Sequence, residues 1–311
     1  MKTLVLDDGR RIEFNPADKG QGTTARDDVV LICEGGEKVA VSRFQLFHFL
    51  KIEPALRATE ECMKAHKKNK FFGLFIVGKP GCGKSSYVIR MLSEVYGTCG
   101  YDSHIFRLET DSGEYRELPL YIVWEHRWDA WKEWLVFLPD QFVKKLSEVQ
   151  TTAKQERMMA WDDAGVWLSK YNWASEFSQG VSDQFEVIRR SFASVVFTCP
   201  NSKKLLKSIR DFPAMAKGKP VEVRGDDDKR RIKVYERDIN LADDKEYPNR
   251  LFDEYYDVML PDHVFAEYDP VSRMYGKIVT IFLEKALRDL RERGAYRYAE
   301  AVKEMADMVK Q

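Results

Sequence analysis

The chain has 311 residues, of which 44% are hydrophobic, so it is long enough to bury a large core with appended regions. Lysine plus arginine and aspartate plus glutamate both number 50, so any contact with nucleic acid must come from local patches rather than from overall charge. Long apolar spans and a basic-then-apolar N-terminus are absent, and the five cysteines lack C-x-x-C spacing, which favours a reducing cytoplasmic compartment without membrane insertion.

The first part of the chain, 1–60, predicts a β-rich region followed by linker helices. Hydrophobic residues alternate in four short runs around glycine-containing turns, which is typical of two hairpins. The expected strands are 4–6, 11–14, 29–33 and 39–41. Two helices should follow, one capped by Ser42 and one opened by Pro54.

The next stretch contains a phosphate-binding pattern. An apolar run at 71–77 precedes Gly-Lys-Pro-Gly-Cys-Gly-Lys-Ser at 78–85, and a helical pattern follows. This matches G-x-x-x-x-G-K-[ST], the P-loop, whose backbone N–H groups wrap around a β-phosphate. Lys84 would bridge the β- and γ-phosphates of ATP, and Ser85 would offer its hydroxyl to Mg²⁺. The predicted nucleotide site consists of Gly78, Lys79, Pro80, Gly81, Cys82, Gly83, Lys84, Ser85 and Ser86.

An inserted hairpin and an aromatic series should follow the P-loop helix. Strand patterns over 104–109 and 115–124 flank a turn at 111–114. The tryptophans Trp124, Trp128, Trp131 and Trp134 come next. Their spacing places at least three on one helical face, which indicates a packed core or interface, with stacking on nucleic-acid bases as the alternative.

Residues 158–163 predict the second element of the phosphate site. After a short strand at 135–138 and a helix capped by Asp140, four apolar residues run into Asp162 and Asp163. This is typical of a Walker B strand, which delivers carboxylates to the sheet edge beside the P-loop. Asp162 would hold Mg²⁺ through its water shell, and Asp163 would orient or deprotonate the attacking water. An exposed acidic turn is the alternative.

A further buried strand at 193–199 ends in polar residues. In ATPases with a strand inserted between the P-loop and Walker B strands, a polar residue there contacts the γ-phosphate or the attacking water, and Thr198 is the candidate. Asn201 lies one residue beyond the usual position. No arginine within the nucleotide motifs has the spacing of a finger in cis, so Arg190 and Arg210 are candidates for one supplied in trans, which predicts a homo-oligomer.

The last part of the chain, 216–311, looks less like a nucleotide core. A hairpin with a charged tip and a third strand should come first. The expected strands are 221–224, 231–239 and 251–260. Two amphipathic helices should follow Pro261 and Pro270, separated at Gly294.

Two basic clusters are candidate DNA contacts. The first, 66–70, is either a solvated helix end or a nucleic-acid contact. The second consists of Lys229, Arg230, Arg231 and Lys233 on the predicted hairpin. Three aspartates at 226–228 would repel phosphate or pair with those same arginines, so a solvated turn is the alternative there.

The D-D-x-G element at 162–165 and the preceding strand-Pro-x-x-Phe helix resemble those of DnaC/IstB-type helicase loaders and transposition helpers, which are AAA+ ATPases. The segments 131–142 and 161–168 also resemble P-loop ATPases carried by archaeal viruses and plasmids. The resemblance spans about 70–210. It implies ATP and Mg²⁺ as ligands, DNA and a replication or mobile-element protein as partners, and functional roles for Lys84, Ser85, Asp162, Asp163 and Thr198. The four-helix lid of AAA+ proteins is not evident, so a second sensor arginine is not placed.

These patterns together predict an α/β P-loop ATPase, AAA+-like, with a parallel central sheet. A β-rich region (1–60) would precede the ATPase core (61–215), and a β-hairpin plus helical region (216–311) would follow. Hydrolysis of ATP to ADP and phosphate would switch a DNA- or helicase-bound assembly. The alternatives are a nucleotide-gated scaffold of a mobile element with incidental turnover, and a small-molecule kinase, which would need an arginine-rich lid that is not recognisable in the sequence.

Replacing Lys84 by alanine is expected to abolish tight ATP binding, because the loop then lacks its side-chain charge on the β- and γ-phosphates. A binding titration with ATP measures this effect. Unchanged affinity would contradict the site assignment.

Overall fold

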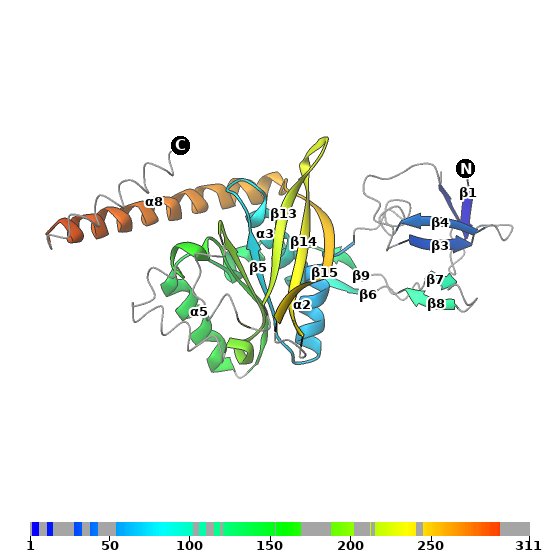
Figure 1. Cartoon of the computed structure of the whole chain (residues 1–311), viewed down its shortest axis with the longest axis horizontal. Coiled ribbons are helices and arrows are strands. Elements are labelled where there is room, and N and C mark those ends of the chain that lie inside the picture. The colour runs from blue at the N-terminus through cyan, green and yellow to red at the C-terminus, as the bar shows by residue number, and fades with distance from the viewer. Residues whose placement is uncertain are drawn as a thin grey trace. The chain divides into compact units, whose positions relative to one another are not determined.

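The computed structural model describes residues 2–5, 11–14, 28–32, 38–42, 54–101, 106–109, 115–118, 121–152, 154–168, 188–201, 212, 215–240 and 245–292. The chain divides into two compact units, Met1–Val258 and Met259–Gln311. Figure 1 shows a sheet with packed helices in the first unit and one long helix, α8 (Asp262–Glu292), in the second.

In the described part of the chain, four two-stranded antiparallel sheets lie outside the central sheet. Their pairs are β1 (Lys2–Val5) with β2 (Arg11–Phe14), β3 (Asp28–Ile32) with β4 (Lys38–Ser42), β6 (Thr98–Tyr101) with β9 (Tyr121–Glu125), and β7 (Phe106–Glu109) with β8 (Tyr115–Leu118). The first two pairs match the hairpins predicted near the N-terminus. β7 and β8 form the predicted inserted hairpin, whereas the pairing of β9 with β6 was not predicted. The helix expected after Ser42 lies outside the described residues.

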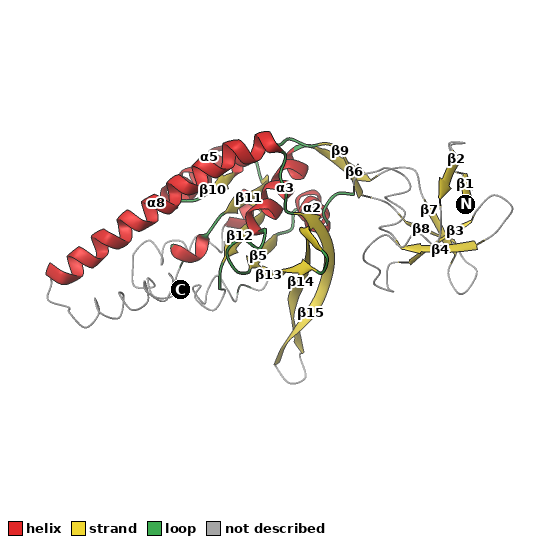
Figure 2. Ribbon diagram, turned by 90° about the horizontal axis from the view of Figure 1, so that it is seen from above, coloured by secondary structure: helices red, strands yellow, loops and turns green. Residues whose placement is uncertain are grey.

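A seven-stranded sheet forms the core of the first unit, in the order β10-β11-β12-β5-β13-β14-β15. Its strands are β5 (Phe72–Val77), β10 (Leu135–Val136), β11 (Glu156–Trp161), β12 (Phe192–Cys199), β13 (Met215–Val223), β14 (Asp226–Asn240) and β15 (Lys245–Asp257). From β10 to β13 neighbouring strands run parallel, and β14 and β15 continue the sheet antiparallel. Figure 2 shows β14 and β15 extending past the parallel strands.

The parallel part of the sheet is buried on both faces, which explains its almost continuous apolar strands. All of β12 is buried, and it lies between β5 and β11. The carboxyl ends of these three strands therefore meet at one edge, where the P-loop leaves β5 and the two aspartates leave β11. A mixed α/β layout with a mostly parallel sheet is consistent with a P-loop NTPase-like fold.

Helices cover both faces of the parallel strands. α2 (Arg57–Lys67) and α3 (Lys84–Tyr96) pack on one face, where Cys62 of α2 contacts β11. α5 (Pro139–Thr152) packs on the other, with the rings of Phe142 and Trp161 stacked 4.8 Å apart. The domain boundary expected at residue 215 falls at the first residue of β13. Because β13 pairs with β5, the main-chain hydrogen bonds of one sheet join the two sides of this boundary.

The prediction that the tryptophans share one helical face is wrong. Trp124 lies on β9 and is 56% exposed, because pairing with β6 imposes the period of a strand there. Trp128 lies in a turn. Trp131 and Trp134 belong to α4 (Ala130–Trp134) and are buried, so these two are core residues rather than a surface for base stacking.

The C-terminal helix also differs from the prediction. α8 begins at Asp262 and continues through Pro270, so Pro270 does not separate an earlier segment from the helix. Proline removes one main-chain donor, which a helix of 31 residues tolerates at one position. The second predicted helix lies outside the described residues. Within the described part of the chain, no helix is both long and apolar enough to cross a membrane.

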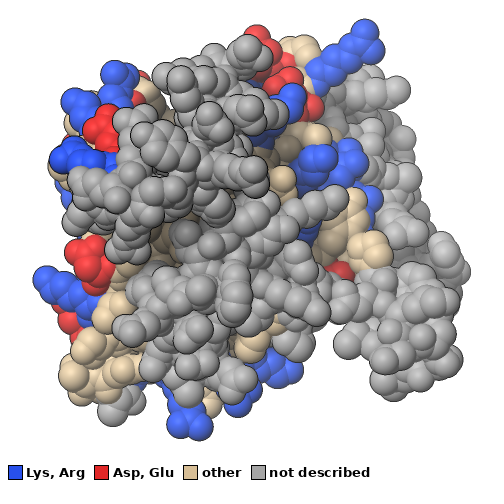
Figure 3. Space-filling view, turned by 60° about the vertical axis from the view of Figure 1, so that its left-hand side comes forward, with Lys and Arg blue, Asp and Glu red and all other residues tan. Residues whose placement is uncertain are grey.

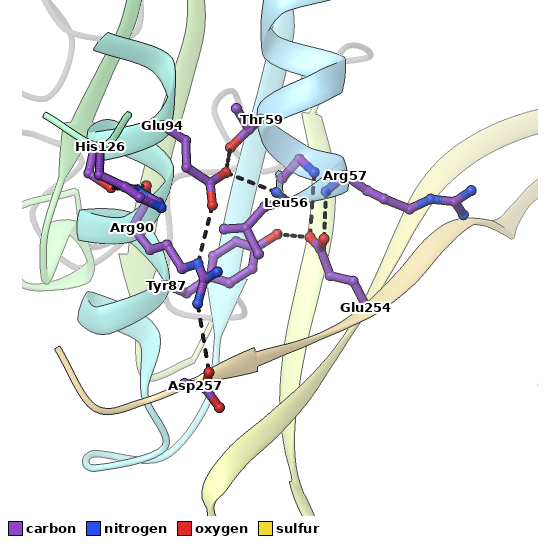
Figure 4. Close-up of polar contacts among 11 residues, drawn as sticks. Leu56, Arg57, Thr59, Tyr87, Arg90, Glu94, His126, Glu254 and Asp257 are labelled. Carbon is purple, nitrogen blue, oxygen red and sulfur yellow. Dashed lines mark hydrogen bonds and ion pairs between the residues drawn. The ribbon is translucent and has the colours of Figure 1, made fainter. Parts of the chain in front are cut away.

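The amino end of α2 is held by carboxylates from other elements (Figure 4). Leu56 stands at its N-cap and offers no side-chain cap. The buried carboxylate of Glu94, on α3, accepts hydrogen bonds from the Leu56 N–H (2.9 Å) and the Thr59 hydroxyl (2.6 Å). Arg90 donates to the same carboxylate at 3.2 Å, which balances its charge.

A second carboxylate, Glu254 of β15, binds the next N–H groups of α2. It accepts from the main chain of Arg57 (2.5 Å) and Ala58 (3.4 Å), and from the Tyr87 hydroxyl of α3 (2.5 Å). Desolvation by the surrounding protein and the nearby charge of Glu94 raise the pKa of Glu254 to about 7, against these donors. Two acids thus join α2, α3 and β15 at one helix terminus.

We expect Glu254→Gln to weaken the dependence of stability on pH. Because the pKa of Glu254 lies above its ordinary value of 4.5, protonation stabilises the fold at low pH, and this contribution is lost as pH rises through about 7. At about 1.4 kcal/mol per pKa unit, the loss is at most about 3.5 kcal/mol. The free energy of unfolding in urea at about pH 5 and about pH 8 measures it.

Glu222→Gln, on an exposed glutamate of β13, is the control and should keep the wild-type pH dependence. Equal pH dependence in Glu254→Gln and wild type would show that Glu254 does not titrate in this range.

Candidate functional site

The loop between β5 and α3 is shaped by glycine. Gly83 is the N-cap of α3 with φ 85°, in the left-handed region that glycine adopts without strain. A Cβ on Gly83 would lie 2.5 Å from Val258 Cγ1, and one on Gly78 would lie 2.6 Å from Cys82 Sγ. A side chain at either position would force Val258 or Cys82 to shift, and at Gly83 it would also strain the backbone, so glycine fits both positions of the motif.

Lys84 points back over this loop from the first turn of α3. Its Nζ donates to the carbonyl oxygens of Gly78 (3.0 Å) and Lys79 (2.9 Å), and the residue is 7% exposed. Lys79, Pro80 and Gly81 form the exposed tip of the loop. An ammonium group and the N–H groups of a helix terminus therefore converge on one place, which is an arrangement that binds phosphate.

Asp162, directly after β11, links this strand to α3 and β12. Its buried carboxylate accepts a hydrogen bond from the Ser85 hydroxyl at 2.9 Å and another from the Thr198 hydroxyl at 2.5 Å. Thr198 also accepts the main-chain N–H of Asp163 at 2.8 Å. A hydroxyl and a carboxylate side by side are the hard oxygen donors that Mg²⁺ prefers, so Ser85 and Asp162 fit a magnesium ion.

The side chain of Asp163 is exposed beside this cluster. Its backbone is left-handed, with φ 50° and ψ 34°, and the exposed side chain stands at the start of a short 3₁₀ turn, Ala164–Val166. Desolvation by the neighbouring protein, followed by the charge of Asp162, raises the pKa of Asp163 to about 6, and Lys84 opposes the rise. With a pKa of about 6 the group is mostly ionised at neutral pH and can accept a proton.

The chain turns closely at the D-D-x-G element. A Cβ on Gly165 would lie 3.0 Å from the Cβ of Cys199, at the end of β12. The glycine of this element therefore allows the turn after β11 to pack against the neighbouring strand.

The remaining predicted residues lie elsewhere. Arg190 is exposed in a helical segment, 188–191, that enters β12 at its amino end. Since β12 has eight residues at roughly 3.3 Å each, Arg190 is roughly 25 Å from the edge that carries its own P-loop. Asn201 is exposed just after β12. Arg210 is outside the described residues.

Tyr256 is a site residue that the sequence did not reveal. Its hydroxyl lies 3.2 Å from the carbonyl oxygen of Gly83, to which it donates, and its ring packs edge-on against Tyr87 at 4.8 Å. It reaches the loop from β15, far along the chain. The alternation of inward-facing Phe252, Glu254 and Tyr256 was a usable signal for this strand, but it does not indicate which element the strand contacts.

We compared the chain with protein families, with curated proteins and with solved structures. No protein-family model matches the sequence. The uncharacterized protein B-251 of Sulfolobus spindle-shape virus 1 is 24% identical over 149 residues, which is 48% of this chain and 51% of that protein. The chain thus spans about half the length of this curated relative.

Among solved structures, the N-terminal domain of zonular occludens toxin from Neisseria meningitidis is similar with a TM-score of 0.33 and 11% sequence identity. The match covers 63% of this chain and 97% of that one. At that TM-score the likeness says nothing further about this chain.

Thr198→Val is expected to leave nucleotide affinity nearly unchanged and to slow the ATP hydrolysis predicted from the sequence about 10- to 100-fold, because a hydrogen bond to a charged group contributes about 1.5–3 kcal/mol. Thr198→Ser keeps the hydroxyl and should restore most of the rate. Binding titrations and phosphate release on both variants measure this. Equal rates in the valine and serine variants would show that the hydroxyl does not position the two aspartates.

Proposed function

We propose that this protein binds ATP with Mg²⁺ at the P-loop and hydrolyses it to ADP and phosphate. One observation carries the proposal, namely the hydrogen-bonded series from Ser85 through Asp162 and Thr198 to the Asp163 main chain, beside Lys84. A phosphate-binding loop alone supports binding only. The two acids that follow β11 add a metal ligand and a proton acceptor, which hydrolysis requires.

Each side chain would have a distinct part in the reaction. Lys84 would exchange its two loop carbonyls for phosphate oxygens, with which a cation interacts more strongly. Bound Mg²⁺, held by Ser85 and through water by Asp162, would neutralise charge on the β- and γ-phosphates. Asp163 would orient the attacking water and take up its proton. Thr198 would hold the two aspartates in their relative positions.

We further propose that hydrolysis serves DNA replication or the maintenance of a mobile element, as in a helicase-loader or DnaA-like switch. The support is the D-D-x-G element at 162–165 and the partial similarity to a viral protein. In this proposal an arginine reaches the γ-phosphate from a neighbouring subunit, since Arg190 lies at the far edge of its own sheet. The functional form would then be a homo-oligomer.

Asp163→Asn is expected to keep ATP affinity and to lower turnover by about 10²- to 10⁴-fold, because an amide cannot accept the proton. In the wild type, turnover should fall as pH drops through about 6, where Asp163 becomes protonated. The variant should lose this inflection.

Asp140→Asn, on an exposed aspartate at the start of α5, is the matched control and should retain both the rate and the pH profile. Wild-type turnover in Asp163→Asn would assign the proton acceptor to another group, and absence of turnover in the wild type would reject hydrolysis altogether.

A further inference from the structure

Charges are unevenly distributed over the surface although the chain is neutral overall. On the side drawn in Figure 3, described lysines and arginines gather in several separate groups, some beside carboxylates. The antiparallel part of the sheet carries a set of cations on one face. We name this set the basic sheet face: Lys217 and Lys219 of β13, Arg231 and Lys233 of β14, and Arg250 of β15.

Strand register places these cations side by side. Lys219 of β13 lies opposite Lys233 of β14, and Lys217 lies opposite Tyr235, which in turn lies opposite Arg250 of β15. Directly paired residues share a face of a sheet and have Cβ atoms about 4.5–5.5 Å apart. The cations therefore form one continuous patch across three strands.

The alternate residues of the same strands face the other way. Ile232 and Val234 of β14 and Tyr256 of β15 are buried, and Glu254 binds α2. The basic sheet face is thus the face opposite to α2 and α3. Lys217 and Lys219 are exposed on it.

The basic sheet face includes one described carboxylate close to its cations. Asp253 lies on the same face, directly opposite Lys233, and forms ion pairs with Arg231 and Arg250. One acid thus lies among the five cations of the set. Lys219 and Lys233 lie directly opposite one another, and like charges in this arrangement destabilise a sheet. A polyanion bound across the strands would relieve that repulsion.

Two tyrosines lie between the cations. The guanidinium of Arg231 is 5.7 Å from the centroid of the Tyr255 ring, and Tyr235 lies between Lys217 and Arg250; both rings are partly exposed. Aromatic rings between cations on an open sheet are the combination that binds single strands, since bases stack on the rings while lysines contact phosphates. An anionic membrane would instead require exposed apolar side chains, of which Val221 (37% exposed) is the example on this part of β13.

We infer that the basic sheet face binds single-stranded nucleic acid. The lysines contact the phosphates and Tyr235 and Tyr255 stack on bases. This places the contact on the opposite side of β14 from Arg230, which donates to the carbonyls of Asp227 and Lys229 within its own turn. The inference supplies the partner surface for the proposed role on DNA, but it does not depend on nucleotide hydrolysis.

The test uses the full chain without nucleotide and a fluorescein-labelled oligothymidylate, with binding followed by fluorescence anisotropy between about 50 and about 200 mM salt. Lys219→Gln combined with Lys233→Gln should lower affinity at least about tenfold and reduce the slope of log affinity against log salt by roughly 1.4, or about 0.7 per lost phosphate contact. Tyr235→Leu should lower affinity about 5- to 100-fold without changing that slope.

The matched control replaces Lys67 and Lys68, two exposed lysines at the end of α2, by glutamine and should bind like the wild type. ATP affinity, measured on the same samples, should be unchanged in every variant, which separates failure of this inference from failure of the nucleotide site. Wild-type affinity in the double-lysine variant, an equal loss in the control, or tighter binding of a duplex of the same length would each overturn the inference. An oligoribonucleotide in a parallel titration distinguishes RNA from DNA.

Discussion

The pairing of β12 between β5 and β11 is the constraint on which the rest of the site depends. It aligns Val77, Cys199 and Trp161 near one edge of the sheet, so that the loop, the hydroxyl of Thr198 and the carboxylate of Asp162 come within hydrogen-bonding reach. All three strands are internal, and most of their apolar residues are buried. The polar site is therefore confined to the strand ends, where the rigid sheet fixes its geometry.

A second layer of organisation comes from β15. Through Glu254 it binds the amino end of α2, and through Tyr256 it contacts the carbonyl of Gly83. The helix that carries Lys84 thus contacts both the parallel strands and β15, the last strand of the same sheet. A shift of β15 would therefore change the position of Tyr256 against the P-loop.

The sequence predicts best those features that depend on local order. The P-loop, the two aspartates and the strands that bear them follow from residue type and spacing, and the structure brings Ser85, Asp162 and Thr198 together. Features set by distant pairing were not predictable in the same way. Trp124 lies on a strand because β9 pairs with β6, although its spacing from the other tryptophans suits a helix. The contact of Tyr256 with Gly83 joins positions 173 residues apart, which no local pattern encodes.

Successive side chains of β15 point to opposite faces of the sheet, so this strand contributes to two separate surfaces. Its even-numbered residues Glu254 and Tyr256 contact the nucleotide-loop side, whereas Asp253 and Tyr255 line the basic sheet face. Because successive side chains of a strand point to opposite faces, a deletion of one residue within 252–257 would exchange the two sets at once. A single substitution in this stretch changes one of the two surfaces, whereas an insertion or deletion of one residue changes both. The length of this stretch is therefore more tightly constrained than its residue types.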